Sequence, residues 1–367
     1  MSAPITISRL FTDKSDLGRT ELRKQEQGSL EAGEVLLEIK SFSLTTNNIT
    51  YAAFGDAMQY WNFFPTGEAG FGHMPVWGFA DVVASTTPGI TVGERFYGYY
   101  PIASHVLMRP GRISPRGFYD VSDHRLDLVS AYNQYSRCSQ DEVYRADRED
   151  LQALFRPLFV TAYMLADYLE DNDWFGAEQL VISSASSKTA YGTAFCLLSE
   201  DRITLTGLTS PRNADFVRGL GCYETTALYD DIEMLDASRP TIYVDFAGDA
   251  ALRARIHHHF GPALMHDCVV GAAHNAPHSK PVDMPGPAPK FFFAPEQIAK
   301  RNKDWGPEEF NRRFSAAQER FFAQIASADP VWMTVKTGHG FEAAQAVIRT
   351  LAESGGDPAM GHMIAFD

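Results

Sequence analysis

The sequence predicts a protein of two parts, a β-rich N-terminal domain and an α/β domain built on a doubly wound parallel sheet. Within about the first 110 residues, β-branched and aromatic runs are separated by turns such as TTPGITVGE, which is typical of strands. From about residue 150, short apolar runs alternate with stretches of helical periodicity, which indicates βαβ units. The length of 367 residues favours two domains.

In the N-terminal part, three runs read as strands: EVLLEIKSFSLT, GFADVVAS and ERFYGYYPIASHVLMRP. Their spacing favours a twisted, partly open barrel. Residues 108–150 are polar and irregular, and they predict a connecting elaboration with short helices.

The second part begins with a helix expected over residues 150–171. The strands expected after it are QLVISS, RITLTGLTS, TTALYDD, PTIYVDFAG, HDCVVGAAH and KFFFAP. The helices expected between them cover residues 189–199, 211–220 and 249–259. Residues 295–328 are helical and charged, and the chain closes with an amphipathic helix and a strand.

The formal net charge of −14 argues against a surface that binds nucleic acid or an anionic membrane. The N-terminus lacks the apolar core of a secretory signal, and no run is long enough to span a bilayer, so we expect a cytoplasmic protein. The four cysteines are widely scattered, which predicts reduced, buried thiols.

The first strand of the parallel sheet is followed by SSASSKTAYG, at the position where a dinucleotide-binding turn carries glycines. The three glycine positions fall on Ser184, Ser186 and Thr189, fairly small residues that keep part of the room. We expect the pyrophosphate to be lined by Ser184, Ser186, Ser187 and Lys188, with Thr189 as a helix-packing or capping residue. A capped turn without a ligand is the open alternative.

The second strand ends in TSPRN, where a site for NAD would place a carboxylate on the ribose 2′-hydroxyl. Thr209, Ser210, Arg212 and Asn213 stand there instead. A hydroxyl and a guanidinium without a carboxylate favour a 2′-phosphate, and therefore NADP(H). The alternative is a solvated Ser-Pro helix start.

The order of these segments resembles the medium-chain dehydrogenase/reductase superfamily, and within it the zinc-free quinone and enoyl reductases. The most similar segments are VRGLGCYETTALYDD and GITVGERFYG. The resemblance implies a GroES-like catalytic domain over residues 1–155, with residues 300–367 packing back on it. It also implies a Rossmann NADP-binding domain over residues 156–299, with the cofactor lying in the cleft.

The same resemblance implies several site residues. Near the nicotinamide it places Asn48, Thr161, Gly271, His274 and Phe293, and at the adenine end Tyr229. The family's zinc-ligand positions fall near Thr45 and in VWGFAD, without cysteine, histidine or glutamate, so we expect no metal.

Without zinc, a hydroxyl or amide must stabilise the charge that develops during hydride transfer. Tyr51 and Asn48 are the candidates, although packing in the barrel wall explains Tyr51 equally well. The aromatic segment 53–72 predicts a substrate pocket containing Tyr60, Trp61 and Phe63, together with His274, and core packing of a long loop is its alternative. The three histidines at 257–259 predict a solvated helix end.

We therefore expect a zinc-independent, NADPH-dependent oxidoreductase that reduces a carbonyl or activated C=C of a small, partly apolar substrate. The resemblance also implies a homodimer, because members of that family dimerise through edge strands of the Rossmann sheet. Two alternatives stay open: a catalytically silent protein that binds NADPH or senses a ligand, and a redox-neutral enzyme on the same fold.

Overall fold

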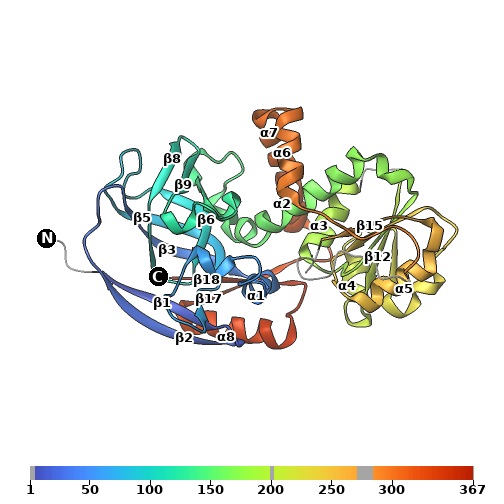
Figure 1. Cartoon of the computed structure of the whole chain (residues 1–367), viewed down its shortest axis with the longest axis horizontal. Helices are drawn as coiled ribbons and strands as arrows, with labels where there is room; N and C mark the ends of the chain where they lie inside the picture. The colour runs from blue at the N-terminus through green and yellow to red at the C-terminus, as the bar shows by residue number, and fades with distance from the viewer. Residues whose placement is uncertain (1–4, 199–201, 271–283, 367) are drawn as a thin grey trace. The chain divides into compact units, whose positions relative to one another are not determined.

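The computed structural model describes residues 5–198, 202–270 and 284–366. The chain divides into two compact units (Figure 1). Unit 1 holds residues 1–154 and 334–367, and unit 2 holds residues 155–333. Each unit has the secondary structure that the sequence predicts, because the first is β-rich and the second contains a parallel sheet with helices.

Unit 1 is built mainly on antiparallel strands. Its N-terminal strands are β1 (Ile5–Asp13), β2 (Asp16–Gln27), β3 (Val35–Leu44), β4 (Phe71–Gly72), β5 (Pro75–Ser85), β6 (Arg95–Pro101), β7 (His105–Met108), β8 (Pro110–Ser114), β9 (Gly117–Asp120) and β10 (Gln134–Arg137). From the C-terminal segment come β17 (Thr334–His339), α8 (Gly340–Ser354) and β18 (Met360–Ala365). In the described residues, the large sheet has the order β17-β18-β3-β5-β6-β10-β9-β8, and β2-β1-β4 form a small sheet. In the large sheet, β17 and β18 pair in parallel.

Short helical segments interrupt these strands. They include the helix α1 (Thr46–Ala53) and the 3-10 turns η1 (Tyr60–Phe63) and η3 (Ser130–Asn133). Aromatic and aliphatic side chains from the sheet, α1, η1 and α8 form one buried core. The predicted elaboration at residues 108–150 includes strands β8, β9 and β10, so it belongs to the sheet and does not merely connect domains.

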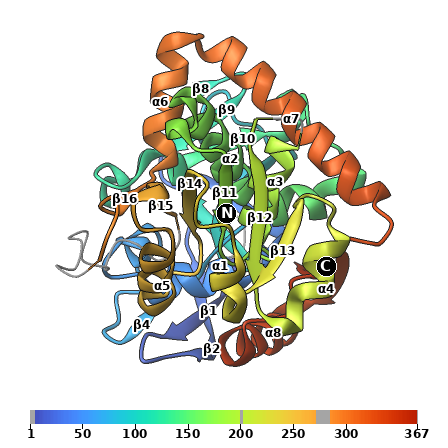
Figure 2. The ribbon, with the colours of Figure 1, turned by 90° about the vertical axis from the view of Figure 1, so that its right-hand side faces the viewer.

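Unit 2 contains a parallel sheet of β13 (Thr225–Leu228), β12 (Thr204–Thr209), β11 (Gln179–Ile182), β14 (Thr241–Asp245), β15 (Leu264–Val269) and β16 (Lys290–Phe291), in that spatial order. Every neighbouring pair is parallel, and Figure 2 shows the strands side by side in this order. Chain order reverses between β11 and β14. In doubly wound sheets this reversal opens the ligand crevice at the carboxyl ends of the strands.

The helices of unit 2 are α2 (Glu149–Asp171, beginning in unit 1), α3 (Lys188–Leu197), α4 (Ala214–Gly219), α5 (Ala250–Phe260), α6 (Ala294–Asp304) and α7 (Pro307–Ser327). One apolar side of α5 packs on the sheet through Leu252, Ile256 and Phe260. Within the described residues, no helix is long and apolar enough to cross a membrane.

The division differs from the expected one at its C-terminal boundary. Residues 300–333 were expected with the N-terminal domain, but they belong to unit 2. Phe321 of α7 stacks on Phe159 of α2 with ring centroids 4.5 Å apart, and Arg301 of α6 pairs with Asp167 of α2 at 2.7 Å. Only β17, α8 and β18 return to unit 1, because β18 pairs with β3.

His73 of unit 1 and His266 of unit 2 are buried in surroundings that disfavour protonation. His73 donates from Nδ1 to the Leu10 carbonyl at 2.9 Å, and His266 stacks on Phe175 with centroids 3.9 Å apart. Burial lowers the pKa of each imidazole to about 4. The unfolded chain takes up these protons near pH 6.5, so the folded state loses stability as the pH falls from about 6.5 to about 4.

We predict that lowering the pH from 7 to 5 costs about 2 kcal/mol of unfolding free energy for each of His73 and His266. The variant His73→Gln should lose that share of the pH dependence, because glutamine has no proton to gain. Urea unfolding of both proteins at the two pH values measures the effect, and His124→Gln, at a half-exposed position, is the control. An unchanged slope in His73→Gln would contradict the assignment.

Candidate functional site

The loop after β11 has the backbone of a strand that turns at once into a helix. Ser187 is the N-cap of α3, and its hydroxyl accepts the Ala190 amide at 3.4 Å. Capping was expected at Thr189, which lies too late in the chain: it is already the second residue of the helix, and its carbonyl accepts the Thr193 hydroxyl at 2.9 Å. Lys188 opens the helix, where its charge adds to the positive end of the helix dipole.

Ser184, at the first expected glycine position, has a φ of +48°. This left-handed conformation costs a residue with a side chain about 1 kcal/mol, and such strain persists where the surrounding structure holds it. The holding contact comes from Tyr229, which follows β13: its hydroxyl accepts the Ser184 amide at 3.0 Å. Serine therefore adopts the backbone that glycine would adopt more easily, with a tyrosine from another loop fixing it.

The two loops that suggested a cofactor in the sequence are joined directly. Asn213 donates from Nδ2 to the Ser186 hydroxyl at 3.1 Å, which links the turn after β12 to the turn after β11. Ser210 begins that second turn in a half-buried position, and Arg212 is exposed. No carboxylate stands at residues 209–214, so the position that holds the ribose hydroxyl in NAD sites carries no negative charge.

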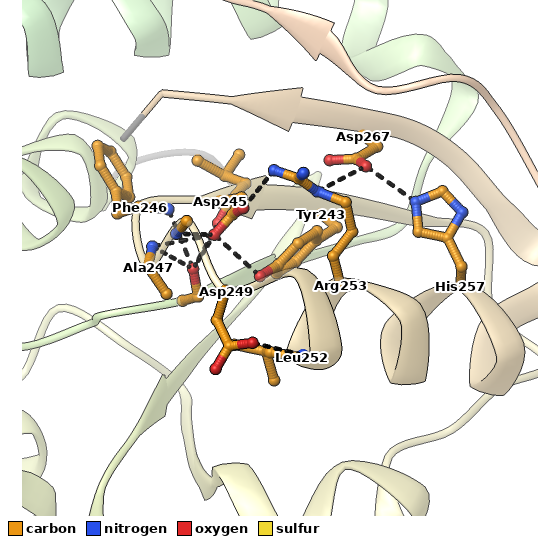
Figure 3. Close-up of polar contacts among 12 residues, drawn as sticks. Tyr243, Asp245, Phe246, Ala247, Asp249, Leu252, Arg253, His257 and Asp267 are labelled. Carbon is orange, nitrogen blue, oxygen red and sulfur yellow. Dashed lines mark hydrogen bonds and ion pairs between the residues drawn. The ribbon is translucent and has the colours of Figure 1, made fainter. Parts of the chain in front are cut away.

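A buried carboxylate that sequence reasoning missed ties β11 to β14. Figure 3 shows Asp245 at the end of β14, where Oδ1 accepts the amides of Ala247 at 2.9 Å and Gly248 at 3.0 Å. The same oxygen accepts the Ser183 hydroxyl at 3.0 Å. Ser183, at the end of β11, in turn accepts the Phe246 and Ala247 amides at 3.0 and 3.1 Å. These contacts fix both sides of the crevice.

The charge of Asp245 is matched inside the protein. Arg253 of α5 pairs with Asp245 through Nη2 and approaches Asp267 of β15 through Nε at 3.3 Å. The Nε2 atom of His257 lies 2.8 Å from the Asp267 carboxylate (Figure 3). The other ring nitrogen of His257 lies 2.6 Å from the Pro285 carbonyl. The predicted solvated end at residues 257–259 is wrong for His257, which is fully buried because this network satisfies its nitrogens.

Two further residues that were expected at the cofactor, Thr161 and Phe293, lie on other elements. Thr161 is half-buried on α2, and Phe293 is the N-cap residue of α6, stacked on Phe291 with centroids 6.2 Å apart. Gly271 and His274 lie outside the described residues. The structure thus brings together Ser184, Ser186, Asn213 and Tyr229.

In unit 1, Asn48 closes the N-terminus of α1. Its Oδ1 accepts the Thr45 amide at 2.7 Å, and its Nδ2 donates to the Pro75 carbonyl at 2.9 Å, fastening the helix to β5. These bonds give Asn48 a structural task. Its expected role beside a nicotinamide stays a prediction.

Tyr51, one turn further along α1, is buried among aromatic rings. Its hydroxyl accepts the Trp77 Nε1–H at 3.3 Å, and its ring lies 4.8 Å from that of Tyr60. Burial, reinforced by Tyr60, raises the pKa of Tyr51 well above its ordinary value. The phenol therefore keeps its proton at neutral pH, and it is suited to donate a hydrogen bond rather than to give up the proton.

Trp61 and Phe63 are buried in the core of unit 1. Trp61 covers Gly55 and Gly72, where an added Cβ would lie 2.1 and 2.3 Å from the indole. Core packing of the loop, the alternative kept open above, accounts for both side chains. Their contact with a substrate stays a prediction.

Thr45 lies near the position where the resemblance places a zinc ligand of the family, and His73 lies just before VWGFAD in the sequence. Both side chains have other partners. Thr45 caps α1 by accepting the Asn47 amide at 3.2 Å, and His73 is committed to Leu10. Among the described residues, no group of three or more His, Cys, Asp or Glu side chains is placed to hold a metal ion.

Residues 42–357 match the family described as "Protein of unknown function (DUF2855)". A search of the curated proteins found no match. Among solved structures, CurA in complex with NADPH from Vibrio vulnificus is similar, with a TM-score of 0.59 and 13% identity, covering 100% of this chain and 99% of that chain.

Two further structures share the fold. CurK enoyl reductase has a TM-score of 0.53 at 12% identity, covering 98% of this chain and 99% of that chain. A point mutant of Etr1p, in complex with NADP and crotonyl-CoA, has a TM-score of 0.57 at 10% identity, covering 99% of this chain and 100% of that chain. The expected fold is confirmed: the chain has the fold of the medium-chain dehydrogenases/reductases.

We predict that Asp245→Asn lowers the free energy of unfolding of unit 2 by about 3 kcal/mol, because it leaves Arg253 without its full partner in a buried site. Asp230→Asn, at an exposed position, should change it by less than about 0.5 kcal/mol. Urea unfolding followed by circular dichroism gives both values. Equal stabilities of the two variants would contradict a structural role for the buried carboxylate.

Proposed function

We propose that this chain, which belongs to the DUF2855 family, is an NADPH-dependent oxidoreductase that reduces a carbonyl or an activated C=C of a small, partly apolar substrate. The observation that carries the proposal is the hydrogen bonding among the loops that follow β11, β12 and β13. Parallel sheets of this topology bind dinucleotides at these carboxyl ends. The fold shared with structures that hold NADPH or NADP supports the same cofactor.

The residues of unit 2 fit a dinucleotide phosphate. Ser186, Ser187 and Lys188 stand at the start of α3, where the helix dipole favours an anion. The left-handed backbone at Ser184 turns the chain so that the helix can begin directly after the strand. Thr161, Tyr229, Gly271 and Phe293 complete the proposed cofactor site, by the resemblance described above.

The second turn supports the choice of NADPH over NADH. Arg212 is exposed, Ser210 and Asn213 lie beside it in one 3-10 turn, and Asn213 is oriented by Ser186. A guanidinium matches the 2′-phosphate of NADPH in geometry and charge. We propose that Ser210, Arg212 and Asn213 hold that phosphate.

NADPH would supply the hydride, and we propose Tyr51 and Asn48 as the residues that serve the reduction. The buried phenol of Tyr51 retains its proton and donates a hydrogen bond to the oxygen that becomes negative. Asn48 positions Tyr51 by closing the helix that carries it. Tyr60, Trp61, Phe63 and His274 are the proposed neighbours of the substrate.

We propose that the reaction proceeds without zinc. The Thr45 hydroxyl caps α1, the His73 imidazole bonds to the Leu10 carbonyl, and the sequence has no cysteine at the positions where the resemblance places the zinc ligands. We also propose a cytoplasmic homodimer with no nucleic-acid or membrane partner, in line with the formal net charge of −14.

A catalytically silent protein is the second candidate. It is favoured by one observation: the Ser184 amide is bonded to Tyr229, so the loop keeps its shape without a bound phosphate. Two measurements separate the candidates. Calorimetric titration of the full chain with NADPH and NADH measures binding, and an assay with enones, quinones and aldehydes measures turnover. Binding without NADPH oxidation on any of these favours the silent protein or a redox-neutral enzyme, and no saturable binding rejects the proposal.

We predict that Arg212→Ala weakens NADPH binding by about 10- to 100-fold and leaves NADH binding within about twofold, because only NADPH carries the 2′-phosphate. Arg218→Ala is the matched control, since Arg218 is exposed on the following helix and pairs with Asp215 at 2.7 Å. Dissociation constants for both nucleotides measure the effect. An equal loss of affinity for NADH would show that Arg212 does not act on the 2′-phosphate.

We predict that Lys188→Ala weakens NADPH and NADH alike, by about tenfold, because both carry the pyrophosphate that Lys188 faces in the proposed site. Lys303→Ala, exposed on α6, is the control. The same titrations measure both variants. Unchanged affinity in Lys188→Ala would make the loop a capped turn without a ligand.

A further inference from the structure

Unit 1 contains a compact group of four tyrosines and one tryptophan from five different elements. We call Tyr51, Tyr60, Trp77, Tyr99 and Tyr132 the tyrosine cluster. The ring centroids of Tyr51 and Tyr60, and those of Tyr99 and Tyr132, lie 4.8 Å apart. Trp77 lies 5.1 Å from Tyr99. A cluster drawn from α1, η1, β5, β6 and η3 is formed only by the fold, so its hydroxyls are not a local sequence feature.

The hydroxyls of the cluster are linked to one another. The Trp77 Nε1–H donates to the Tyr51 hydroxyl at 3.3 Å, and the Tyr60 and Tyr132 hydroxyls are 3.3 Å apart. The Tyr51 hydroxyl also interacts with the side chains of Tyr132 and Asn47. Each phenol carries one O–H that can rotate toward a better acceptor, so an oxygen placed beside these hydroxyls could receive a hydrogen bond.

Tyr99 adds an unmet requirement. Its ring is fully buried beside those of Tyr51, Trp77 and Tyr132, and within the described part of the chain its hydroxyl has no hydrogen-bond partner. A buried hydroxyl without a partner costs about 1–3 kcal/mol. An oxygen that enters the cluster would receive a hydrogen that the protein leaves unused.

The cluster carries no formal charge. Burial is the main cause that raises the pKa of Tyr51, Tyr60, Tyr99 and Tyr132, so all four are neutral phenols at neutral pH. The nearby buried Arg125 is paired with Asp120 at 3.2 Å. Neutral donors surrounded by rings favour a neutral, planar acceptor over a carboxylate or phosphate, whose desolvation nothing in the cluster would offset.

Tyr132 has a special position in the cluster. It and Trp77 are only partly buried, whereas Tyr51, Tyr60 and Tyr99 belong to the core. Its ring contacts every other member, with centroids 6.1 Å from Tyr51, 5.6 Å from Tyr60 and 6.0 Å from Trp77. Tyr132 therefore connects the more exposed side of the cluster to the Tyr51 phenol.

We propose that the tyrosine cluster binds the carbonyl oxygen of an uncharged planar substrate, and that Tyr132 is a positioning residue that acts through Tyr51. The proposal rests on the proposed function and names its substrate class. Bound NADPH would supply the hydride for the new C–H bond, and the π pair of the C=O bond would move to oxygen. The Tyr51 O–H would donate a hydrogen bond to that oxygen, and a proton from water would complete the product.

Steady-state kinetics of the full chain, with NADPH and 2-methyl-1,4-naphthoquinone, tests the role of Tyr132. Tyr51→Phe should lower kcat about 100-fold and Tyr132→Phe about tenfold, with KM for NADPH unchanged. The double variant should be no slower than Tyr51→Phe, because Tyr132 acts only through Tyr51. Multiplying losses, or a wild-type rate in Tyr132→Phe, would overturn the role.

Tyr100→Phe is the matched control for folding. Tyr100 is a fully buried tyrosine of the same strand as Tyr99, and its hydroxyl donates to the Phe96 carbonyl at 3.1 Å. It should lower the thermal midpoint about as much as Tyr132→Phe and leave kcat unchanged. A kcat loss in Tyr100→Phe equal to that in Tyr132→Phe would reduce the effect of Tyr132 to stability and overturn the proposal.

A binding measurement separates this proposal from the proposed function. In the presence of NADP⁺, which has no hydride to give, calorimetry compares 2-methyl-1,4-naphthoquinone with 2-hydroxy-1,4-naphthoquinone, which is anionic at neutral pH. We expect the neutral quinone to bind at least tenfold more tightly, and Tyr132→Phe to reduce that preference. Equal binding of the two, or binding of neither, overturns the proposal. Selective binding without turnover upholds the site and rejects the reductase.

Discussion

The structure of unit 2 depends on the burial of one carboxylate, Asp245, at the point where the chain order of the parallel strands reverses. Asp245 is fully buried, so its charge is tolerated only because donors surround it: two backbone amides, the hydroxyls of Ser183 and Tyr243, and the guanidinium of Arg253. These donors come from β11, from α5 and from β14 with the turn that follows it. Moving the end of β11 away from β14 would remove hydrogen bonds from a buried charge, which is costly. The carboxylate therefore fixes the ends of these two strands next to each other.

That constraint explains how a nucleotide-type loop persists without glycine. With the end of β11 fixed through Ser183, the chain must turn at Ser184, and it does so in the left-handed region. The strain of about 1 kcal/mol is offset by one hydrogen bond of ordinary strength, from the Ser184 amide to Tyr229. Glycine makes the same turn by conformational freedom, and this chain makes it through tertiary contacts.

Unit 1 depends on a different constraint, the packing of many aromatic residues against its β-sheets. Asn48 closes α1 and attaches it to β5, which brings Tyr51 under Trp77. The aromatic rings bury a large apolar surface in this core. They also bring in phenolic hydroxyls, and aromatic rings offer these hydroxyls no strong hydrogen-bond acceptor. A surplus of neutral donors is tolerable in a wall that meets ligand or water, and it is costly in a sealed core.

The sequence by itself determined the fold and the location of the two turns that follow β11 and β12. Strand-like runs separated by turns predicted the first domain, and apolar runs that alternate with helical stretches predicted the second. SSASSKTAYG and TSPRN identified two turns that the structure joins through Ser186 and Asn213. Periodicity reports which faces are buried, so it predicts elements well. It contains no information about which distant segments meet.

Only the tertiary structure decided the rest. It buried His257 in an ion network where the pattern of three histidines suggested solvent, and it placed α6 and α7 with unit 2 through Phe321 and Arg301. It also gathered five aromatic residues from five elements around Tyr132. Most of these contacts join residues tens to more than a hundred positions apart, and long-range packing, not local propensity, selects such partners.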